Sequence, residues 1–132
     1  MLSDKQMKIK NEEECIVEIL TANQERFRIK LLRAIAPLTV SQIMRKLPLK
    51  SIIIIHEGKM YIPLDIDVKA DKTVKRAVRG DVTYSTISKS MVIYMRDSEI
   101  QKPEIKLGQA LDIEELSKIK SGTSIILTGG DK

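Results

Sequence analysis

Apolar and polar side chains alternate along two segments near the start of the chain, and this period of two predicts a pair of strands. The first segment is Cys15–Leu20. In the second, Glu25–Leu32, the apolar residues Phe27, Ile29 and Leu31 are separated by arginine and lysine, as in a half-buried strand with a charged outer face. The short polar connection between the segments favours an antiparallel hairpin.

A run of isoleucines in the middle of the chain predicts a buried strand. Four consecutive isoleucines lie within Ser51–Ile55, and we expect both faces of this strand to be covered because no solvent-facing residue interrupts the run. Glu57 and Gly58 then form a tight-turn dipeptide that leads into a strand at Lys59–Ile62. These two strands would form a second hairpin.

The segment after this hairpin predicts a loop and then a third hairpin. Asp71–Arg79 is basic and of mixed pattern, and we interpret it as loop and exposed surface. Short apolar strands follow at Val82–Tyr84 and Met91–Met95, separated by the polar run Ser85–Ser90.

The first of two predicted helices begins at Thr39, with Gln42 as the third residue of a capping box. Pro48 ends it. Its apolar residues fall at helical spacing on one face: Val40, Ile43, Met44 and Leu47.

The second predicted helix spans Ile113–Lys120. Asp112 stands at the position of a cap, and Glu115 lies three residues further on, where it can complete a capping box. Gly122 supplies the left-handed residue that ends many helices. A single apolar stripe follows the helical spacing: Ile113, Leu116 and Ile119.

Strands flank this helix and complete the pattern. Ile105 and Leu107 alternate with lysine, and Gly108 then interrupts, as glycine does at a bulge or where two backbones approach closely. The pattern of Ser124–Leu127 predicts a closing strand. Seven or eight short strands with two helices predict an all-β barrel or sandwich whose ends are covered by the helices.

Composition is consistent with one folded domain. The chain has 132 residues, of which 42% are hydrophobic, 31% charged and only 3% aromatic, so the core must consist mainly of Ile, Leu, Val and Met. We expect residues 1–14 to form a flexible tail and residues 15–132 the domain. The abundance of lysine, glutamate and isoleucine would suit a thermophile.

The apolar segments are too short for membrane insertion. The start of the chain lacks the apolar core of a signal peptide, and the longest apolar run, Ile52–Ile55, cannot span a bilayer. We therefore predict a cytoplasmic protein with no membrane partner.

Four motifs in order give the chain a resemblance to a known family. They are LPLKS (Leu47–Ser51), EGKMYI (Glu57–Ile62), GDVTY (Gly80–Tyr84) and IKLGQALDIEELSKIKSG (Ile105–Gly122). In these the chain resembles the small cyclophilin-like domain family of archaea and thermophilic bacteria. The resemblance implies a closed eight-stranded barrel with two short capping helices. The chain departs from the family at His56, where a tryptophan is frequent, and at Ser85–Ser90, where a proline-glycine loop is frequent.

Several side chains near the predicted turns could line a groove for a peptide or a small ligand. Tyrosine offers an apolar ring with a polar edge, and methionine adapts to irregular surfaces. Packing inside a barrel explains the same residue types and is the favoured interpretation. The candidate ligand-binding residues are His56, Tyr61, Tyr84, Met91, Tyr94 and Arg96.

The sequence offers little for a metal, a cofactor or nucleophilic catalysis. His56 is the only histidine and Cys15 the only cysteine, so an intramolecular disulfide is excluded and no metal-ligand cluster is spaced for binding. Asp65 and Asp67 share a strand face, where paired carboxylates are usually solvated. We expect no cofactor and no metal.

Resemblance to cyclophilins raises the possibility of peptidyl-prolyl isomerase activity. Cyclophilins use an arginine beside an aromatic pocket, whereas the corresponding strand here is Ile52–His56, without arginine, and the chain has no tryptophan. The favoured hypothesis is thus a non-catalytic binding or interaction module. An isomerase with a rebuilt site is the alternative.

A third hypothesis, nucleic-acid binding, comes from the net charge of +5. The excess lies in two regions, and without interleaved aromatic residues we expect only weak, non-specific binding that salt abolishes. The identity of a partner and the oligomeric state stay open. The basic residues are Arg26, Arg28, Lys30, Arg33, Arg45, Lys46 and Lys50 in the first region, and Lys69, Lys72, Lys75, Arg76 and Arg79 in the second.

Overall fold

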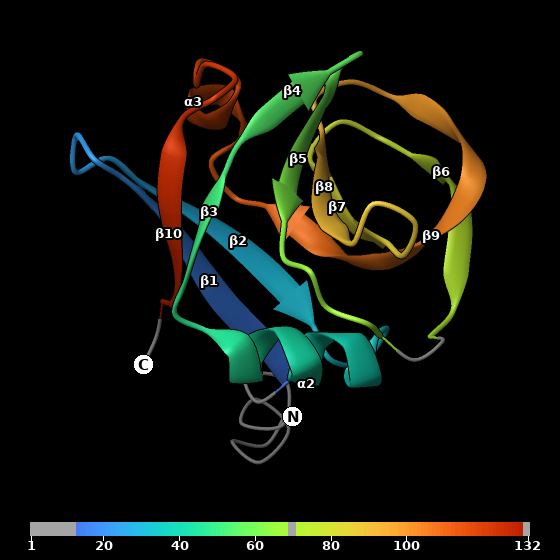
Figure 1. Cartoon of the computed structure of the whole chain (residues 1–132). Coiled ribbons are helices and arrows are strands. Elements are labelled where there is room, and N and C mark those ends of the chain that lie inside the picture. The colour runs from blue at the N-terminus through green and yellow to red at the C-terminus, as the bar shows by residue number, and fades with distance from the viewer. Residues whose placement is uncertain (1–12, 69–70, 131–132) are drawn as a thin grey trace, which may run out of the picture.

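Antiparallel strands are the main secondary structure in the computed structural model, which describes residues 13–68 and 71–130 (Figure 1). The all-β class is confirmed. The elements are β1 (Glu14–Thr21), β2 (Arg26–Leu32), α2 (Pro37–Lys46), β3 (Leu49–Ile52), β4 (Ile54–His56), β5 (Lys59–Pro63), β6 (Thr73–Ala77), β7 (Asp81–Ser85), β8 (Ser90–Tyr94), β9 (Ser98–Ala110), α3 (Ile113–Leu116) and β10 (Ser124–Gly129).

All three predicted hairpins are confirmed. They are β1–β2, β4–β5 and β7–β8. In the second, Glu57 and Gly58 have φ values of +51° and +77°, the positive angles that a two-residue turn between twisted strands favours. The predicted tail comprises residues 1–14, of which residues 1–12 lie outside the described residues. Glu14, at the end of the predicted tail, already belongs to β1.

The strands form one ten-stranded sheet in the order β3-β10-β1-β2-β9-β7-β8-β5-β4, with β6 paired to β9. Both the predicted number of eight strands and the predicted closure are wrong. The path begins in β3 and ends in β4, which are consecutive segments separated only by Ile53, so they cannot pair with each other. The Ile53 amide donates to the Thr123 carbonyl at 2.9 Å and its carbonyl accepts from Gly122 at 2.7 Å, which fixes the chain where the two strands meet.

The isoleucine run is covered on one face only, contrary to prediction. Ile53 is fully buried and Ile55 is half-buried, but Ile52 and Ile54 are 39% and 44% exposed. Side chains alternate along a strand, and no second layer covers the outer face at this edge. The run therefore leaves apolar surface in contact with solvent.

Residues 71–79, predicted as a loop, contain strand β6. It pairs with β9, and the register shifts from Val74 opposite Glu104 to Arg76 opposite Glu99. The shift leaves extra residues in β9, so this long strand curves, as Figure 1 shows for the orange segment. Sequence pattern favoured a loop because β6 exposes most of its side chains.

β6 and the first half of β9 create a second core. All five residues of β7 and of β8 are buried. In β8, Met91 and Ile93 face the main core, whereas Val92 and Tyr94 pack with Ala77 and other residues of the second core. A sheet that is normally solvated on one face is here covered on both.

The predicted apolar face of the first helix is confirmed, but its cap is not. Val40 and Ile43 are fully buried in the main core. The helix begins at Pro37, and the carboxylate of Asp71 accepts hydrogen bonds from the amide and the hydroxyl of Thr39, each at 2.8 Å. A distant residue thus satisfies a free amide of the first turn in place of a capping box.

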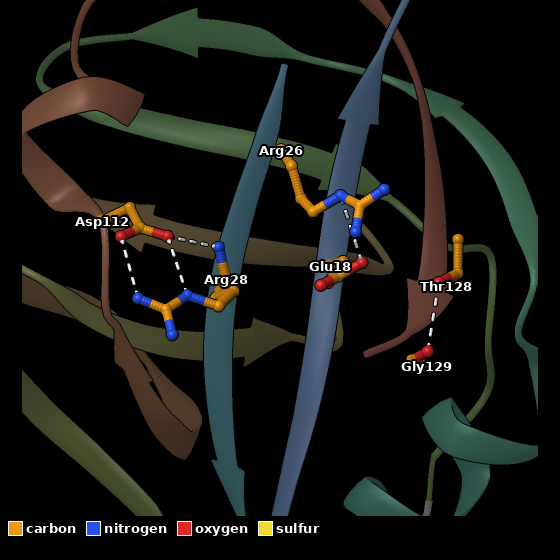
Figure 2. A network of polar contacts seen from close by, with 6 residues as sticks. All are labelled: Glu18, Arg26, Arg28, Asp112, Thr128 and Gly129. Atoms are coloured by element: carbon orange, nitrogen blue, oxygen red, sulfur yellow. Dashed lines mark hydrogen bonds and ion pairs between the residues drawn. The ribbon is translucent and has the colours of Figure 1, made fainter. Parts of the chain in front are cut away.

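Asp112 precedes α3 as predicted, but its carboxylate bonds to β2 instead of capping the helix. It accepts from the Arg28 amide at 2.7 Å and from the guanidinium at 3.4 Å (Figure 2). The helix ends at Leu116, earlier than the predicted Lys120, and turn hydrogen bonds continue the chain. Gly122, with φ of +94°, has the predicted left-handed conformation.

Candidate functional site

A hollow of about 710 Å³ opens over the second core. It is lined by β5 and the turn before it, by the β7–β8 turn, and by residues 96–102 of the chain entering β9. Its rim carries both signs of charge, with Glu57 and Glu99 near Lys59 and Arg96. Glu104 of β9 contributes to the lining from within the fold, since it is only 8% exposed.

Glu104 is held by two hydroxyl groups. The hydroxyl of Thr83 in β7 donates to Glu104 Oε1 at 2.6 Å, and the hydroxyl of Tyr94 in β8 donates to the same oxygen at 2.7 Å. The strands β7, β8 and β9 are neighbours in the sheet, and their outer faces bring these side chains together. Both donors fix the orientation of the carboxylate.

The second carboxylate oxygen of Glu104 has no partner among the described residues. The fully buried side-chain oxygens that lack a hydrogen bond among the described residues are Gln42 Oε1 and Asp81 Oδ1, and Asp81 Oδ1 lies 3.4 Å from the Lys106 ammonium. Glu104 Oε2 also has no hydrogen-bond or ion-pair partner in that part of the chain, and Glu104 is one of the residues that line the hollow. A largely buried carboxylate without a cation is costly for a fold to keep.

Tyrosines surround this carboxylate. Burial raises the pKa of Tyr94 above its ordinary value, and the hydrogen bond to Glu104 raises it further. Burial also raises the pKa of Tyr61, and the negative charges of Glu104 and Glu57 raise it further. The Lys59 ammonium lies 5.5 Å from the centre of the Tyr94 ring, within the range of a cation–π contact. Tyr94 therefore acts as a hydrogen-bond donor at every physiological pH.

The raised pKa of Tyr94 predicts a loss of stability in alkali. Above about pH 10 an unfolded tyrosine loses its proton while folded Tyr94 retains it, so the folded state binds more protons and the free energy of unfolding falls as pH rises. We expect Tyr94→Phe to reduce this slope by up to about 1.4 kcal/mol per pH unit. Urea unfolding of both proteins between pH 9 and about 11.5 measures it. Equal slopes would contradict the assignment.

The structure brings together some of the predicted ligand-binding residues. Tyr61 and Arg96 line the hollow. Tyr94 does not line it, but its hydroxyl donates a hydrogen bond to Glu104, which does. Arg96 also donates to the Glu57 carbonyl at 3.4 Å, across the β4–β5 turn.

The remaining predicted residues lie elsewhere. Tyr84 and Met91 are fully buried in the main core, where the Tyr84 hydroxyl donates to the Ile66 carbonyl at 2.6 Å, so packing explains both residues. His56 is exposed beside the β4–β5 turn and lies 3.7 Å from Glu57. It does not line the hollow.

Glu104 was missed from the sequence. Alternation with Ile105 and Leu107 places it on the opposite strand face, which in an ordinary antiparallel sheet is solvated. Only the cover formed by β6 and the curved part of β9 makes this face interior. If residues 73–77 had been predicted as a strand, the burial of the strand face that carries Glu104 could have been inferred.

Ion pairs and hydrogen bonds occupy much of the predicted basic surface. Arg26 lies 3.7 Å from Glu18 (Figure 2), and Lys30 lies 3.9 Å from Glu14. In the second region Arg79 lies 3.2 Å from Glu114, whereas Lys69 lies outside the described residues. Paired surface cations offer less to a phosphate backbone, and nucleic-acid binding stays a prediction.

The other candidate groups have structural partners. The Lys89 ammonium lies 3.0 Å from Asp67 and 3.9 Å from Asp65. Cys15 is half-buried against the main core. Within residues 13–68 and 71–130, no group of three potential metal ligands is assembled. No helix in the same ranges combines the length and the hydropathy needed to cross a bilayer.

Comparison with known proteins identifies a shared fold. The chain matches no protein-family model and no curated protein. Its structure is similar to the solution structure of the hypothetical protein AF2241 from Archaeoglobus fulgidus, with a TM-score of 0.70 and 20% identity over 89% of this chain and 96% of that one. It is also similar to McbB, solved in complex with tryptophan, with a TM-score of 0.69 and 13% identity over 88% of this chain and 45% of McbB. At these identities the similarity establishes the fold alone.

Proposed function

We propose that the protein is a non-catalytic binding module whose hollow over the second core receives a cationic amine of a small ligand or peptide. The observation that carries this proposal is Glu104, a lining residue of the hollow that is 8% exposed, whose Oε1 accepts from two hydroxyl donors and whose Oε2 has no partner among the described residues. An ammonium group at Oε2 would supply the missing counter-charge, and charge-assisted hydrogen bonds are the strong ones.

The mixed charge of the rim extends the proposal to ligands that carry an amine and a carboxylate together. Arg96 and Lys102 stand on the rim, opposite in charge to Glu104 in the interior. An amino acid or a peptide end presents both groups a few bonds apart. The ring of Tyr61, half-buried in the same hollow, offers an apolar surface for a side chain.

We further propose that the chain is a relative of the cyclophilin-like family. The four sequence motifs support this relationship, whereas the open ten-stranded sheet differs from the closed eight-stranded barrel that the resemblance implies. The isomerase alternative stays second, because β4 supplies no arginine.

Three ligands with one ring separate the charge requirements. McbB was solved with tryptophan, which makes the indole series a reasonable choice of probe. We expect tryptamine and tryptophan to bind wild-type protein, and indole-3-propionate to bind at least about tenfold more weakly because it lacks the amine. Titration calorimetry, or amide chemical shifts if affinity is low, measures the three dissociation constants.

Glu104→Gln is the decisive variant, because glutamine keeps an oxygen for Thr83 and Tyr94 but removes the charge. We expect it to lose at least about tenfold in tryptamine affinity without a loss of thermal stability. Glu115→Gln is the control, since Glu115 is an exposed glutamate of α3 that does not line this hollow. Equal affinities in wild type and Glu104→Gln would refute the proposal.

A further inference from the structure

A second hollow, of about 590 Å³, lies on the outer face of the sheet formed by β3, β10, β1 and β2. It borders the β1–β2 turn, which projects from the body of the protein in Figure 1. Its volume falls within the range of small-molecule sites. None of the residues that line it is acidic.

Strand register sets a defined row of side chains across this hollow. Lys50 of β3 is opposite Ile126 of β10, Ile126 is opposite Leu20 of β1, and Leu20 is opposite Arg26 of β2. Two apolar residues thus lie side by side with one cation at each end. At about 4.8 Å between strands, the two ends of the row are roughly 14 Å apart.

The apolar part of the row is open to solvent. Ile126 is 39% exposed, and so is Ile52, which lies opposite Ser124 in the neighbouring row. Ile52 belongs to the isoleucine run that was predicted as a buried strand, and Ile126 belongs to the predicted closing strand Ser124–Leu127. Ile52 does not line the hollow, so the apolar contact surface of the hollow is exposed Ile126 with half-buried Leu20 beside it.

The two cations are not equivalent. Arg26 already lies 3.7 Å from Glu18 (Figure 2). Lys50 is exposed and has no carboxylate within 4.0 Å among the described residues. Its charge is therefore the one available at the edge of the apolar surface.

We propose that this hollow binds an amphipathic carboxylate, that is, the anion of a fatty-acid-like molecule. Its alkyl chain lies over Leu20 and Ile126, and its carboxylate pairs with Lys50. Charge complementarity selects this occupant, because an anionic head satisfies Lys50 and meets no acidic side chain in the lining. The site is separate from the Glu104 hollow, which would take a cation.

Decanoate, used below its micelle concentration, is the probe, with decylamine as the ligand of opposite charge. We expect saturable binding of decanoate to the full chain by titration calorimetry, with decylamine at least about tenfold weaker. Lys50→Glu should weaken decanoate binding by about tenfold, and Ile126→Asn should weaken it severalfold. Lys75→Glu, at an exposed lysine of β6 that lines neither hollow, should bind decanoate as wild type does.

Thermal unfolding and light scattering complete the test. Both key positions are exposed, so we expect the variants to unfold at the wild-type temperature. Equal decanoate affinity in wild type and Lys50→Glu, or equal binding of decylamine and decanoate, would overturn the proposal. It would also be overturned by a wild-type dimer that Ile126→Asn converts to a monomer, because a second copy would then cover this face.

Discussion

Replacing Ile53 with aspartate is expected to destabilise the protein by about 4 kcal/mol, a large part of the total stability of a domain. Ile53 is fully buried at the junction of β3 and β4. Its backbone amide and its carbonyl both form hydrogen bonds with the segment before β10. A carboxylate there would have no counter-charge. The adjacent Ile54 is 44% exposed, so Ile54→Asp should cost no more than about 1 kcal/mol.

Urea unfolding of the two variants measures this difference. The pair is matched in residue type, chemistry and strand environment, and it differs in the face on which the side chain lies. Similar losses of stability in both variants would contradict the one-sided burial of the isoleucine run.

Gly108→Ala is expected to cost about 3 kcal/mol, because overpacking would here act on backbone atoms. A Cβ atom at this position would fall onto the carbonyl oxygen of Lys30 and lie 2.9 Å from its carbonyl carbon. Lys30 belongs to β2, which pairs with β9 at Leu31 and Gly108. The clash can be relieved only by separating these two strands.

Gly129→Ala is the matched control. It is also a strand glycine, but an added Cβ atom would meet only the methyl group of Met44 at 3.9 Å, an ordinary contact. We expect its midpoint of thermal unfolding to stay close to that of wild type. Wild-type stability in Gly108→Ala would show that β2 and β9 do not approach as closely as described.

Much of the fold is local and was predictable. The three hairpins follow from alternating apolar residues and from turn dipeptides such as Glu57 and Gly58, which act within a few residues. The apolar face of α2 follows from helical spacing in the same way. The close approach at Gly108 was also predicted correctly, because glycine weakens a strand interior and is typically kept there where a bulge or a neighbouring backbone requires it.

Features that depend on distant partners could not be read from the sequence. Asp71 caps α2 from 32 residues away, and the Asp112 carboxylate bonds to Arg28 across 84 residues. Local capping rules therefore misplaced the start of α2 and, although the start of α3 is correct, assigned Asp112 a side-chain cap that it does not make. β6 forms because β9 curves over it, although its own pattern is that of exposed surface. Without β6 there is no second core.

The candidate site depends on the same long-range event. Tyr61 and Arg96 were identified as candidates from residue type, whereas Glu104 was not, because its burial requires the cover provided by β6. Tyr84 and Met91 were included because a tyrosine or methionine in a strand has the same local pattern in a core and in a groove. Residue type alone cannot separate these two environments.

The amide shift map of the ¹⁵N-labelled protein titrated with tryptamine tests the central claim most directly. If the ammonium binds Glu104, the largest shifts are expected at Glu104, at Tyr94 and Thr83, which hold its carboxylate, and at Tyr61 on the wall of the hollow. The same titration of Glu104→Gln should leave these amides unmoved, while Glu115→Gln, at a glutamate outside the hollow, should reproduce the wild-type map. Shifts confined to the outer sheet around Ile126, or a wild-type pattern of shifts in Glu104→Gln, would contradict the account.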